Sequence, residues 1–422
     1  MKIVLSARGS RGDVYPMIAI AAGLKAAGHD VALCVPRLFD ELAGRRQLPG
    51  PRYTEDSQAL MQGFGSGWGA AREALSWLRR SVDEGFEVLL DATEDADLLV
   101  TSTNEVPPPS VATYRRIPHF RVTYAPMLPG SHPPPLLPWQ WFPGPINRLA
   151  WRALNGSVRL LVGSRLNHWR GRLGLEPVGA MGPYFSGQSH TLLAVSPALC
   201  PPDPDWTYRY SYTGYCHSED EGALDPGLQR FLDDGPPPVY IGFGSACVKD
   251  PTAATARLFE AVLRADLRAI VAGGWTGLGQ REVPRYIHLV RGDVPHATLF
   301  PHLAAVVHHG GSGTVHNAAR AGLPQLLMPQ IADQYYWADR IHTLGLGPAP
   351  IPAAHMGLRR LRRALDRLCR DPGYRTRAAG LSHAIRAERG VERTVAAITG
   401  VEAQPFLATT RARRPTASSR CT

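Results

Sequence analysis

Lysine is scarce in this sequence, and its scarcity affects how the positive charge is interpreted. Only three of the 46 basic residues are lysines (Lys2, Lys25 and Lys249), and the formal net charge is +10. A charge of this size could attract nucleic acid, anionic lipid or a phosphorylated ligand. The arginines are scattered, however, with local clusters only at residues 359–363 and 411–414. We therefore expect no nucleic-acid partner.

The sequence also lacks paired cysteines and long apolar runs. Its six cysteines form no C-x-x-C motif and no regular spacing, which indicates free thiols in a reducing compartment. No apolar run reaches the ~18 residues of a membrane span, and Arg8 ends the first apolar run too early for a secretory leader. These absences predict a cytoplasmic protein with at most a peripheral membrane contact.

Metal and dinucleotide motifs are absent as well. No His/Cys group has the spacing of a zinc site, and Gly9 and Gly12 have no third glycine to complete G-x-G-x-x-G. D-x-D occurs at 95–97 and 203–205. The first precedes an expected strand and the second lies among prolines, so we attribute both to chance. The sequence predicts neither a metal nor a cofactor.

The chain does contain an alternation of apolar strands and amphipathic helices. Its 422 residues, 44% of them hydrophobic, suffice for two α/β domains. A strand over 1–7 and a loop at 8–13 are expected to precede a helix that holds Pro16 in its first turn, and a second strand follows at 31–35. Further helices are expected over 50–95, 148–175 and 381–397.

The glycine-rich segment 308–314 (HHGGSGT) is the strongest single pattern. An apolar strand at 303–307 precedes it, and a helix at 315–321, closed by Gly322, follows it. The glycines therefore lie on a strand-to-helix turn, where backbone N–H groups and the positive end of a helix dipole converge. Such a turn suits a phosphate, although a tight turn that needs glycine only for steric reasons would have the same sequence.

A second motif follows the first at a fixed distance. Asp333 and Gln334 come just after an apolar strand at 325–329. The two motifs together resemble the donor-binding motif of nucleotide-sugar glycosyltransferases, through His309, Gly311, Ser312, Gly313, Thr314, Asp333 and Gln334. The run 294–334 as a whole resembles the family 1 glycosyltransferases of the GT-B fold, in the branch of antibiotic and sterol glycosyltransferases.

This resemblance implies an α/β GT-B architecture, in which two Rossmann-like domains face each other across a cleft. The first domain would bind the acceptor and the second the donor. The expected divisions are an acceptor-binding domain (1–215), a linker (216–236), a nucleotide-sugar-binding domain (237–380), a helix that returns to the first domain (381–404) and a disordered basic tail (405–422).

Asp13 has two interpretations. A carboxylate at a helix start is stabilised by the helix dipole by ~0.3–1 kcal/mol, so capping alone would explain it. The alternative is a general base, kept ionised by the dipole and by Arg11. Ser10, Arg11, Gly12 and Asp13, followed by Pro16, match the N-terminal signature of the antibiotic and sterol branch. In that branch, an Asp at this position is the proposed base.

The resemblance also distributes the donor contacts. The diphosphate is expected at the N–H groups of 312–314 together with His309 and Ser245, and the sugar hydroxyls at Asp333 and Gln334. Two departures affect the nucleotide. Asn317 stands where plant relatives have a ribose-binding Glu, and Arg291 stands where they have a Trp that stacks on the base, with Trp275 as an alternative stacking partner. The backbone of Val294 is expected to contact the base.

The reaction implied is an inverting, metal-independent transfer of a hexose. UDP-glucose is the favoured donor and a dTDP-sugar the alternative, while the acceptor would be a hydroxyl of an apolar natural product, sterol or lipid. Two other functions stay open. One is a sugar-nucleotide epimerase of the same fold, and the other is a catalytically silent partner protein that activates another enzyme.

The proline-rich segment 125–146 carries Trp139, Trp141 and Phe142. Its prolines exclude a regular helix or strand, and long loops of this kind often have a function. An apolar acceptor site, a contact with a membrane surface and a loop folded onto its own domain are the interpretations that the sequence leaves open. Within 50–95, a core stripe or the lining of an acceptor pocket would explain the periodic residues Trp68, Leu75, Leu78, Val82 and Phe86.

Overall fold

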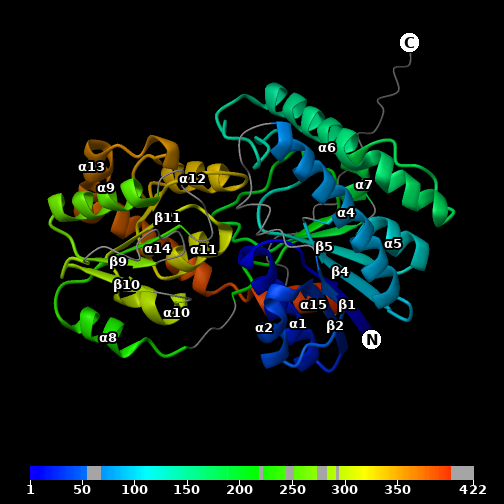
Figure 1. Ribbon diagram of the computed structural model, residues 1–422, viewed down its shortest axis with the longest axis horizontal. Coiled ribbons are helices and arrows are strands. Elements are labelled where there is room, and N and C mark those ends of the chain that lie inside the picture. Colours follow the sequence, from blue (N-terminus) through cyan, green and yellow to red (C-terminus); the bar gives the residue numbers. More distant parts are fainter. Residues whose placement is uncertain are drawn as a thin grey trace, which may run out of the picture.

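The computed structural model places the chain in two α/β units that lie side by side (Figure 1). It describes residues 1–54, 68–103, 105–187, 189–217, 222–243, 251–272, 283–290 and 294–400, without the side chains of 68–74 and 251–252. Each unit has one parallel sheet with helices packed on it. The expected α/β class with two Rossmann-like domains is confirmed.

The first unit has a seven-stranded sheet. Its order is β3 (Arg52–Tyr53), β2 (Asp30–Pro36), β1 (Lys2–Ser6), β4 (Leu98–Ser102), β5 (His119–Thr123), β6 (His190–Leu193) and β7 (Tyr210–Tyr212). Its helices are α1 (Arg11–Ala26), α2 (Asp40–Arg45), α4 (Trp68–Ala92), α5 (Pro108–Arg115), α6 (Gly144–Arg172) and α7 (Met181–Gly187). The central strands are buried almost throughout, which is why they read as continuous apolar runs.

The second unit has a five-stranded sheet. Its order is β10 (Ile287–Val290), β9 (Ala269–Ala272), β8 (Val239–Gly242), β11 (Ala305–His308) and β12 (Gln325–Leu327). The helices in this half of the chain are α8 (Pro226–Asp233), α9 (Pro251–Arg264), α10 (His296–Leu299), α11 (Ser312–Arg320), α12 (Gln334–Thr343), α13 (Leu358–Arg370), α14 (Pro372–Arg386) and α15 (Gly390–Thr399).

Both sheets reverse their strand order at a point that favours ligand binding. In the first sheet β1 lies between β2 and β4, and in the second β8 lies between β9 and β11. Ligands of open α/β sheets bind outside the carboxyl ends of the strands at such points. The loop before α1 follows β1, and the glycine-rich turn follows β11, so each sheet presents one predicted motif at its own reversal point.

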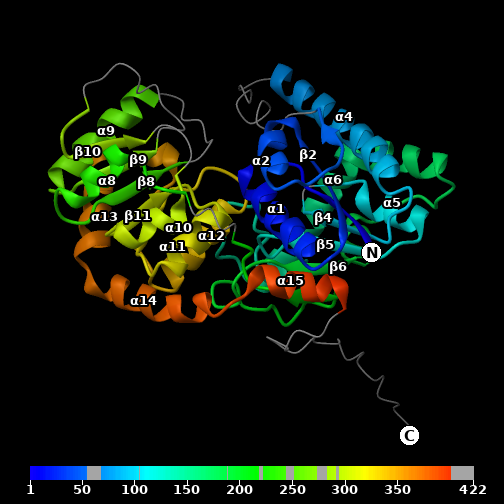
Figure 2. The same ribbon diagram turned by 90° about the horizontal axis from the view of Figure 1, so that it is seen from below.

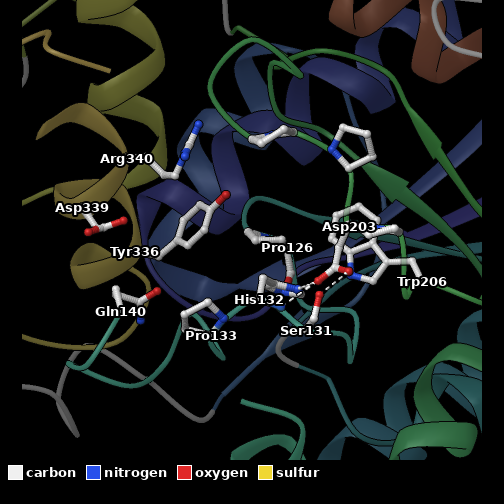
Figure 3. Close-up of a pocket in the computed structure, with 13 residues that line it drawn as sticks. Pro126, Ser131, His132, Pro133, Gln140, Asp203, Trp206, Tyr336, Asp339 and Arg340 are labelled. Atoms are coloured by element: carbon white, nitrogen blue, oxygen red, sulfur yellow. Dashed lines mark hydrogen bonds and ion pairs between the residues drawn. The ribbon is translucent and has the colours of Figure 1, made fainter. Parts of the chain in front are cut away.

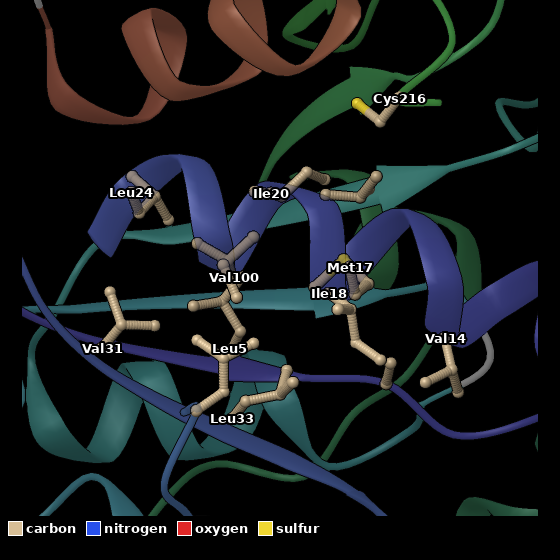
Figure 4. Packing of buried hydrophobic residues seen from close by; sticks show 14 of the residues in the cluster. Leu5, Val14, Met17, Ile18, Ile20, Leu24, Val31, Leu33, Val100 and Cys216 are labelled. Atoms are coloured by element: carbon tan, nitrogen blue, oxygen red, sulfur yellow. The ribbon is translucent and has the colours of Figure 1, made fainter. Parts of the chain in front are cut away.

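Helix α1 is held in place by the core of the first unit. Its apolar residues Val14, Met17, Ile18 and Leu24 recur at helical spacing and are buried against β1, β2 and β4 (Figure 4). Since such a core is closely packed, the start of α1 has a fixed position relative to the sheet.

The chain crosses between the units twice. It first passes from β7 to β8, and we propose the domain boundary within 216–236 on this stretch. After α14, which packs on α11, the chain returns so that α15 lies against α1 (Figures 1 and 2). One core cluster also contains residues of both units, among them Leu199 and Trp206 from the first and Trp337 and Ile341 from the second.

Several predicted elements differ from the observed ones. Helix α1 begins at Arg11, so Pro16 lies inside the helix and not in its first turn. Residues 52–53 form the edge strand β3, although the apolar periodicity around them had suggested helix. Residues 381–397 contribute to two helices, because the chain breaks at Ala387 to change direction toward α1. Val82 and Phe86 of α4 are buried in the core, as one interpretation expected.

Two absences that the sequence suggested can be compared with the structure. In the described part of the chain, no helix combines the length and the apolar character needed to cross a bilayer. Cys34, Cys200, Cys216 and Cys369 are free thiols, as predicted. The other two cysteines and the tail at 405–422 lie outside the described residues.

Candidate functional site

The ring of His308 fixes the turn that follows β11. Its Nε2 lies 2.9 Å from Gln325 Oε1, and its Nδ1 accepts the N–H of Gly310 at 3.1 Å. The ring is therefore neutral with its proton on Nε2. Burial agrees, since it lowers the pKa of His308 to about 3. His308 is thus a structural residue, and its partners set the course of the backbone toward α11.

Gly310 brings the two predicted donor motifs together. Its φ of 101° is readily adopted only by glycine. A Cβ at this position would lie 3.0 Å from the carbonyl oxygen of Gln334. The turn after β11 and the first residues of α12 are therefore in backbone contact, although 24 positions separate them in the chain.

Helix α11 begins at Ser312, with Gly311 as its N-cap. The predicted start at 315 was three residues late, because Ser and Gly have low helix propensity and resemble a loop. The first turn thus holds the N–H groups of Ser312, Gly313 and Thr314, which have no acceptor within the helix. The first intrahelical bond runs from Val315 N to Gly311 O at 3.1 Å. Three backbone donors and the positive helix end converge here on one point.

His309 lies beside this turn with one unsatisfied nitrogen. Its Nδ1 is buried and makes no hydrogen bond to the described residues. Burial lowers the pKa of His309 to about 4, with a partial offset from the Gly242 carbonyl. A Cβ at Gly311 would lie 2.6 Å from His309 Nε2, so only glycine leaves room for the ring. A buried nitrogen without a partner is unfavourable, and a ligand that supplies one would bind well here.

Asp333 precedes α12 and is held by a rigid neighbour. Its Oδ2 accepts the indole N–H of Trp337 at 3.1 Å, and Trp337 is fully buried. The residue before it, Ala332, has a φ of 51°, which is strained for a residue with a side chain. The loop therefore holds the carboxylate in one orientation. The spacing of four between Asp333 and Trp337 was visible in the sequence and would have predicted this contact.

Gln334 has a second role that the sequence did not suggest. Its Oε1 accepts the N–H groups of Gln330 at 2.8 Å and Ile331 at 3.2 Å. The side-chain oxygen thus closes the loop in front of α12. This leaves the amide nitrogen as the part of Gln334 that we propose for contact with a sugar.

Asp13 is the third residue of α1. Its Oδ2 accepts both the N–H of Ser10 at 2.8 Å and the hydroxyl of Ser10 at 3.1 Å, so the capping role is present. The hydroxyl of Tyr124, just after β5, donates to the carbonyl oxygen of Asp13 at 3.2 Å. Arg11 and Gly12, in the same turn, are exposed. The structure thus holds this carboxylate at the edge of the first unit.

The charge of Asp13, on the first unit, affects the pKa of Asp333, on the second. Burial and then the negative charge of Asp13 raise the pKa of Asp333 to about 7. Asp13 also contributes to the raised pKa of Tyr215, after burial and Cys216. Contacts place the two motifs near each other, because Tyr215 shares a core cluster with Val14 of α1 and its hydroxyl lies beside Gly313 of α11.

Two residues of the segment between the sheets also contact α11, and no sequence pattern marked them. The ring of Tyr215 stacks on His316 with centroids 4.6 Å apart, and its hydroxyl would be 2.7 Å from a Cβ at Gly313. His217 Nδ1 lies 2.7 Å from Asn317 Oδ1. Asn317, which was expected at the ribose, is therefore already engaged in fastening the connecting segment to α11.

A buried polar network joins the same helix to the first unit. His316 Nε2 accepts the N–H of Ser196 at 3.1 Å, and its Nδ1 donates to Ser312 O at 2.7 Å. Ser196 Oγ donates to Glu388 Oε1 at 2.6 Å, between α14 and α15. Burial lowers the pKa of His316 to about 3 and raises that of Glu388 to about 7. Three distant segments are thus tied together behind the glycine-rich turn.

Four further residues were predicted to contact the donor nucleotide sugar. Ser245, Trp275 and Arg291 lie outside the described residues. Val294 is partly buried and packs against the cluster around Leu299. Its position as a backbone contact for the base stays a prediction.

A cavity of about 290 Å³ opens between the two units (Figure 3). One wall is α12, through Tyr336 and Arg340, and the other comes from residues 126–140 and 201–206. On that second wall Asp203 accepts hydrogen bonds from the Ser131 hydroxyl at 2.8 Å and from His132 Nδ1 at 2.9 Å. Burial alone would raise the pKa of Asp203, but these bonds hold it well below its usual range. The wall facing α12 is therefore polar and fixed.

The aspartates of the two D-x-D sequences already have partners within the protein. The Lys2 ammonium pairs with Asp95, and the Lys2 N–H donates to Asp97 at 2.7 Å. Asp203 is held by His132, and Asp205 pairs with Arg148 at 2.9 Å. Among the described residues, no group of three His, Cys, Asp or Glu is arranged to hold a metal ion.

Comparison with known families supports the resemblance in both halves of the chain. Residues 256–397 match the C-terminal domain of erythromycin biosynthesis protein CIII-like proteins. Residues 3–50 match the N-terminal domain of glycosyltransferase family 28. The matched ranges contain α11 with its turn, Asp333 and Asp13.

Individual proteins extend the similarity over most of the chain. A sterol 3-beta-glucosyltransferase of Arabidopsis thaliana is 32% identical over 94% of this chain and 67% of its own length. The vancomycin aglycone glucosyltransferase of Amycolatopsis orientalis is 34% identical over 83% of this chain and 87% of its own length. Among solved structures, glycosyltransferase VinC in complex with dTDP aligns with a TM-score of 0.67 at 19% identity, over 95% of this chain and 99% of VinC. This last likeness concerns the fold.

Proposed function

Because the chain belongs to the family 1 glycosyltransferases of the GT-B fold, in the branch of antibiotic and sterol glycosyltransferases, we propose that it transfers a hexose from a nucleotide-diphosphate sugar to a hydroxyl of an apolar small molecule. The observation that carries the proposal is that Tyr215 joins the start of α1, which holds Asp13, to the turn before α11, and the charge of Asp13 raises the pKa of Asp333. A base from one unit and an anion site from the other are the two parts that this chemistry needs.

In the proposed reaction, Asp13 takes the proton of the acceptor hydroxyl. The acceptor oxygen forms a bond to C1 of the sugar, and the bond from C1 to the phosphate oxygen breaks. The electron pair of that bond leaves with the nucleoside diphosphate. Since Asp13 and the diphosphate site belong to opposite units, attack would come from the face away from the leaving group, and the configuration at C1 would invert.

The leaving diphosphate would be stabilised at the start of α11. The N–H groups of Ser312, Gly313 and Thr314 are fixed by the helix before any ligand binds, so they need no reorganisation as charge develops. His309 adds a neutral imidazole whose buried Nδ1 lacks a partner among the described residues. We therefore propose that the transfer needs no metal and no cofactor.

Sugar specificity would depend on the loop before α12. Asp333 would accept hydrogen bonds from sugar hydroxyls, and the amide nitrogen of Gln334 would donate one. This pair favours a hexose with free hydroxyls such as glucose, and hence UDP-glucose as donor. A dTDP-sugar is the alternative, because VinC is described in complex with dTDP. The relatives named for sterol and vancomycin aglycone glucosylation support an apolar acceptor.

The stereochemistry of the product tests this proposal. The protein is incubated with UDP-glucose or a dTDP-hexose and a panel of hydroxylated sterols and polyketide aglycones, and the anomeric coupling constant of any glycoside is measured by NMR. We expect a β-glycoside from an α-linked donor. A product with retained configuration would contradict the placement of Asp13 opposite the leaving group, and an epimerised nucleotide sugar without a glycoside would favour the epimerase alternative.

A further inference from the structure

Exposed hydrophobic side chains are concentrated in one part of the first unit. In the described chain, eight of the fourteen exposed large hydrophobic residues lie within 136–161. These eight, which we name the apolar surface, are Leu136, Trp139, Trp141, Phe142, Ile146, Leu149, Leu160 and Leu161. Trp141 is 70% exposed and Leu160 is 86% exposed. Single exposed hydrophobic residues are normal, whereas a concentration over one loop and one helix marks a surface that binds something.

The loop presents its aromatic residues in a fixed way. The Gln140 amide donates to the carbonyl of Leu137 at 2.6 Å and points toward the cavity between the units, while its neighbours Trp139 and Trp141 are exposed. Asn147 of α6 donates to the carbonyls of Ser131 at 2.9 Å and Phe142 at 2.7 Å. The backbone is therefore folded onto its own domain, as one interpretation expected. The exposed rings are a property of this ordered conformation.

Helix α6 continues the apolar surface and has an unusual distribution of side chains. Its inner face packs against α4, where Trp169 stacks on Phe86 with centroids 5.0 Å apart. Its outer face carries Ile146, Leu149 and Leu160. A surface helix normally turns polar residues outward, so this helix has apolar residues on two faces and only one of them is covered.

The charges on α6 all have one sign. The 29 residues of the helix contain no Asp or Glu and include an exposed row of Arg148, Arg152 and Arg159. At ~100° per residue, this row lies roughly 60–160° around the helix from Ile146, Leu149 and Leu160. Arg152 and Arg159 are the nearer two, at roughly 60–100° from Leu149 and Leu160. Arg148 pairs with Asp205, which leaves Arg152 and Arg159 as the main positive charges beside these apolar residues.

We propose that the apolar surface, together with Arg152 and Arg159, docks the protein on an anionic membrane. Aromatic rings and leucines on one face and arginines beside them are the composition of a helix that lies in the interface of a bilayer. Acidic headgroups complement a helix that has arginines and no carboxylates. The loop that carries the tryptophans also lines the cavity between the units, so docking would bring that cavity close to the lipid surface.

Vesicle flotation of the purified full chain tests the proposal. The probes are vesicles of phosphatidylcholine alone and of phosphatidylcholine with phosphatidylglycerol, in the absence of any nucleotide sugar. We expect binding to the anionic vesicles, which weakens at high salt. The variants W139S/W141S and R152E/R159E are each expected to weaken this binding by ~10-fold or more, since each arginine near an anionic surface and each buried aromatic ring contributes substantially.

Matched variants on the second unit serve as controls. R359E/R363E on α13 makes the same change of net charge as R152E/R159E, and L263S on α9 removes an exposed leucine. Both should bind vesicles as the parent does, and all variants should keep the parent's melting temperature. No binding by the parent, or equal loss in the controls, would overturn the proposal. The proposal would also be overturned if W139S/W141S bound vesicles as the parent does but no longer self-associated in sedimentation. The apolar surface would then bind a second copy of the chain.

This inference goes beyond the proposed transfer reaction, and the two can fail separately. Vesicle binding is measured without donor or acceptor, so an inactive protein would still dock. Conversely, W139S/W141S should keep the parent's response to UDP, because the α11 turn lies on the other unit. Loss of both properties in that variant would indicate misfolding, which the melting temperature detects.

Discussion

Asp13→Asn is expected to lower the rate of hexose transfer by ~10²–10⁴-fold, the usual contribution of a general base. The amide keeps the size of the side chain and its position in the first turn of α1, but it cannot take the proton of the acceptor. The measurement is the release of nucleoside diphosphate under saturating donor and acceptor. Binding of UDP should be unchanged, because the α11 turn does not include this residue.

A matched variant separates this effect from a general loss of charge. Asp30→Asn removes a carboxylate from the same unit, but at the start of β2, the opposite end of the sheet. It should be as active as the parent. If Asp13→Asn transferred sugar at the parent's rate, the carboxylate would only be a helix cap, as its bonds to Ser10 also allow.

The same variant should change the pH dependence of donor binding. Asp333 has a pKa of about 7 in the free protein, so its accepting carboxylate form declines below that pH. The ratio of the affinity for UDP-glucose to the affinity for UDP should therefore decrease as the pH is lowered. Well below the pKa, the decrease should approach ~10-fold per pH unit. In Asp13→Asn one cause of the raised pKa is gone, and the fall should begin at a lower pH. An unchanged profile in that variant would show that the two carboxylates are not close enough to interact.

The second large effect concerns His316, which we expect to be important for stability. His316 is fully buried, and His316→Ala would remove the stack on Tyr215 and the contact with Trp337. It would also leave the Ser196 N–H without its acceptor. Loss of a buried ring and of its hydrogen bonds should lower the free energy of unfolding by ~3 kcal/mol. The measurement is a urea unfolding curve followed by tryptophan fluorescence.

Two other variants identify which part of this contact matters. His316→Phe keeps the ring but not the acceptor, so its midpoint should lie between those of the parent and His316→Ala. His302→Ala changes an exposed histidine and should leave the curve unchanged. A parent-like midpoint for His316→Ala would contradict the view that this network joins the two units.

The parts of the fold that the sequence predicted are those with strong local signals. The buried strands β11 and β12 read as apolar runs, and Gly322 ended its helix as expected, with a positive φ. The start of α11 was harder to predict, because Ser312 and Gly313 are poor helix formers. They are helical here because the turn before them and the packing of α11 hold them in place. The edge strand β3 has two residues and no pattern of its own.

In the candidate site, too, the residues of local motifs could be predicted and the contacts between distant segments could not. His309, Ser312, Asp333 and Asp13 belong to local motifs, so their positions could be predicted one segment at a time. The contacts of Tyr215, His217, Ser196 and Glu388 join segments that are 100 or more positions apart. Neither the periodicity of apolar residues nor the spacing of a motif predicts contacts between segments so far apart in the sequence. For this reason the structure was needed to show that Asn317 fastens the connecting segment to α11.

The binding of nucleoside diphosphates tests the central claim most directly, namely that the turn before α11 is an anion site for the donor. The measurement is the thermal shift with UDP, dTDP and their hexose derivatives. A ligand at ~100 times its Kd should stabilise the protein by ~2.7 kcal/mol. We predict a clear shift with one of the nucleotides, which is lost in Ser312→Trp and kept in Arg320→Trp at the exposed end of the same helix. No shift with any nucleotide, or an equal shift in a well-folded Ser312→Trp, would contradict the account.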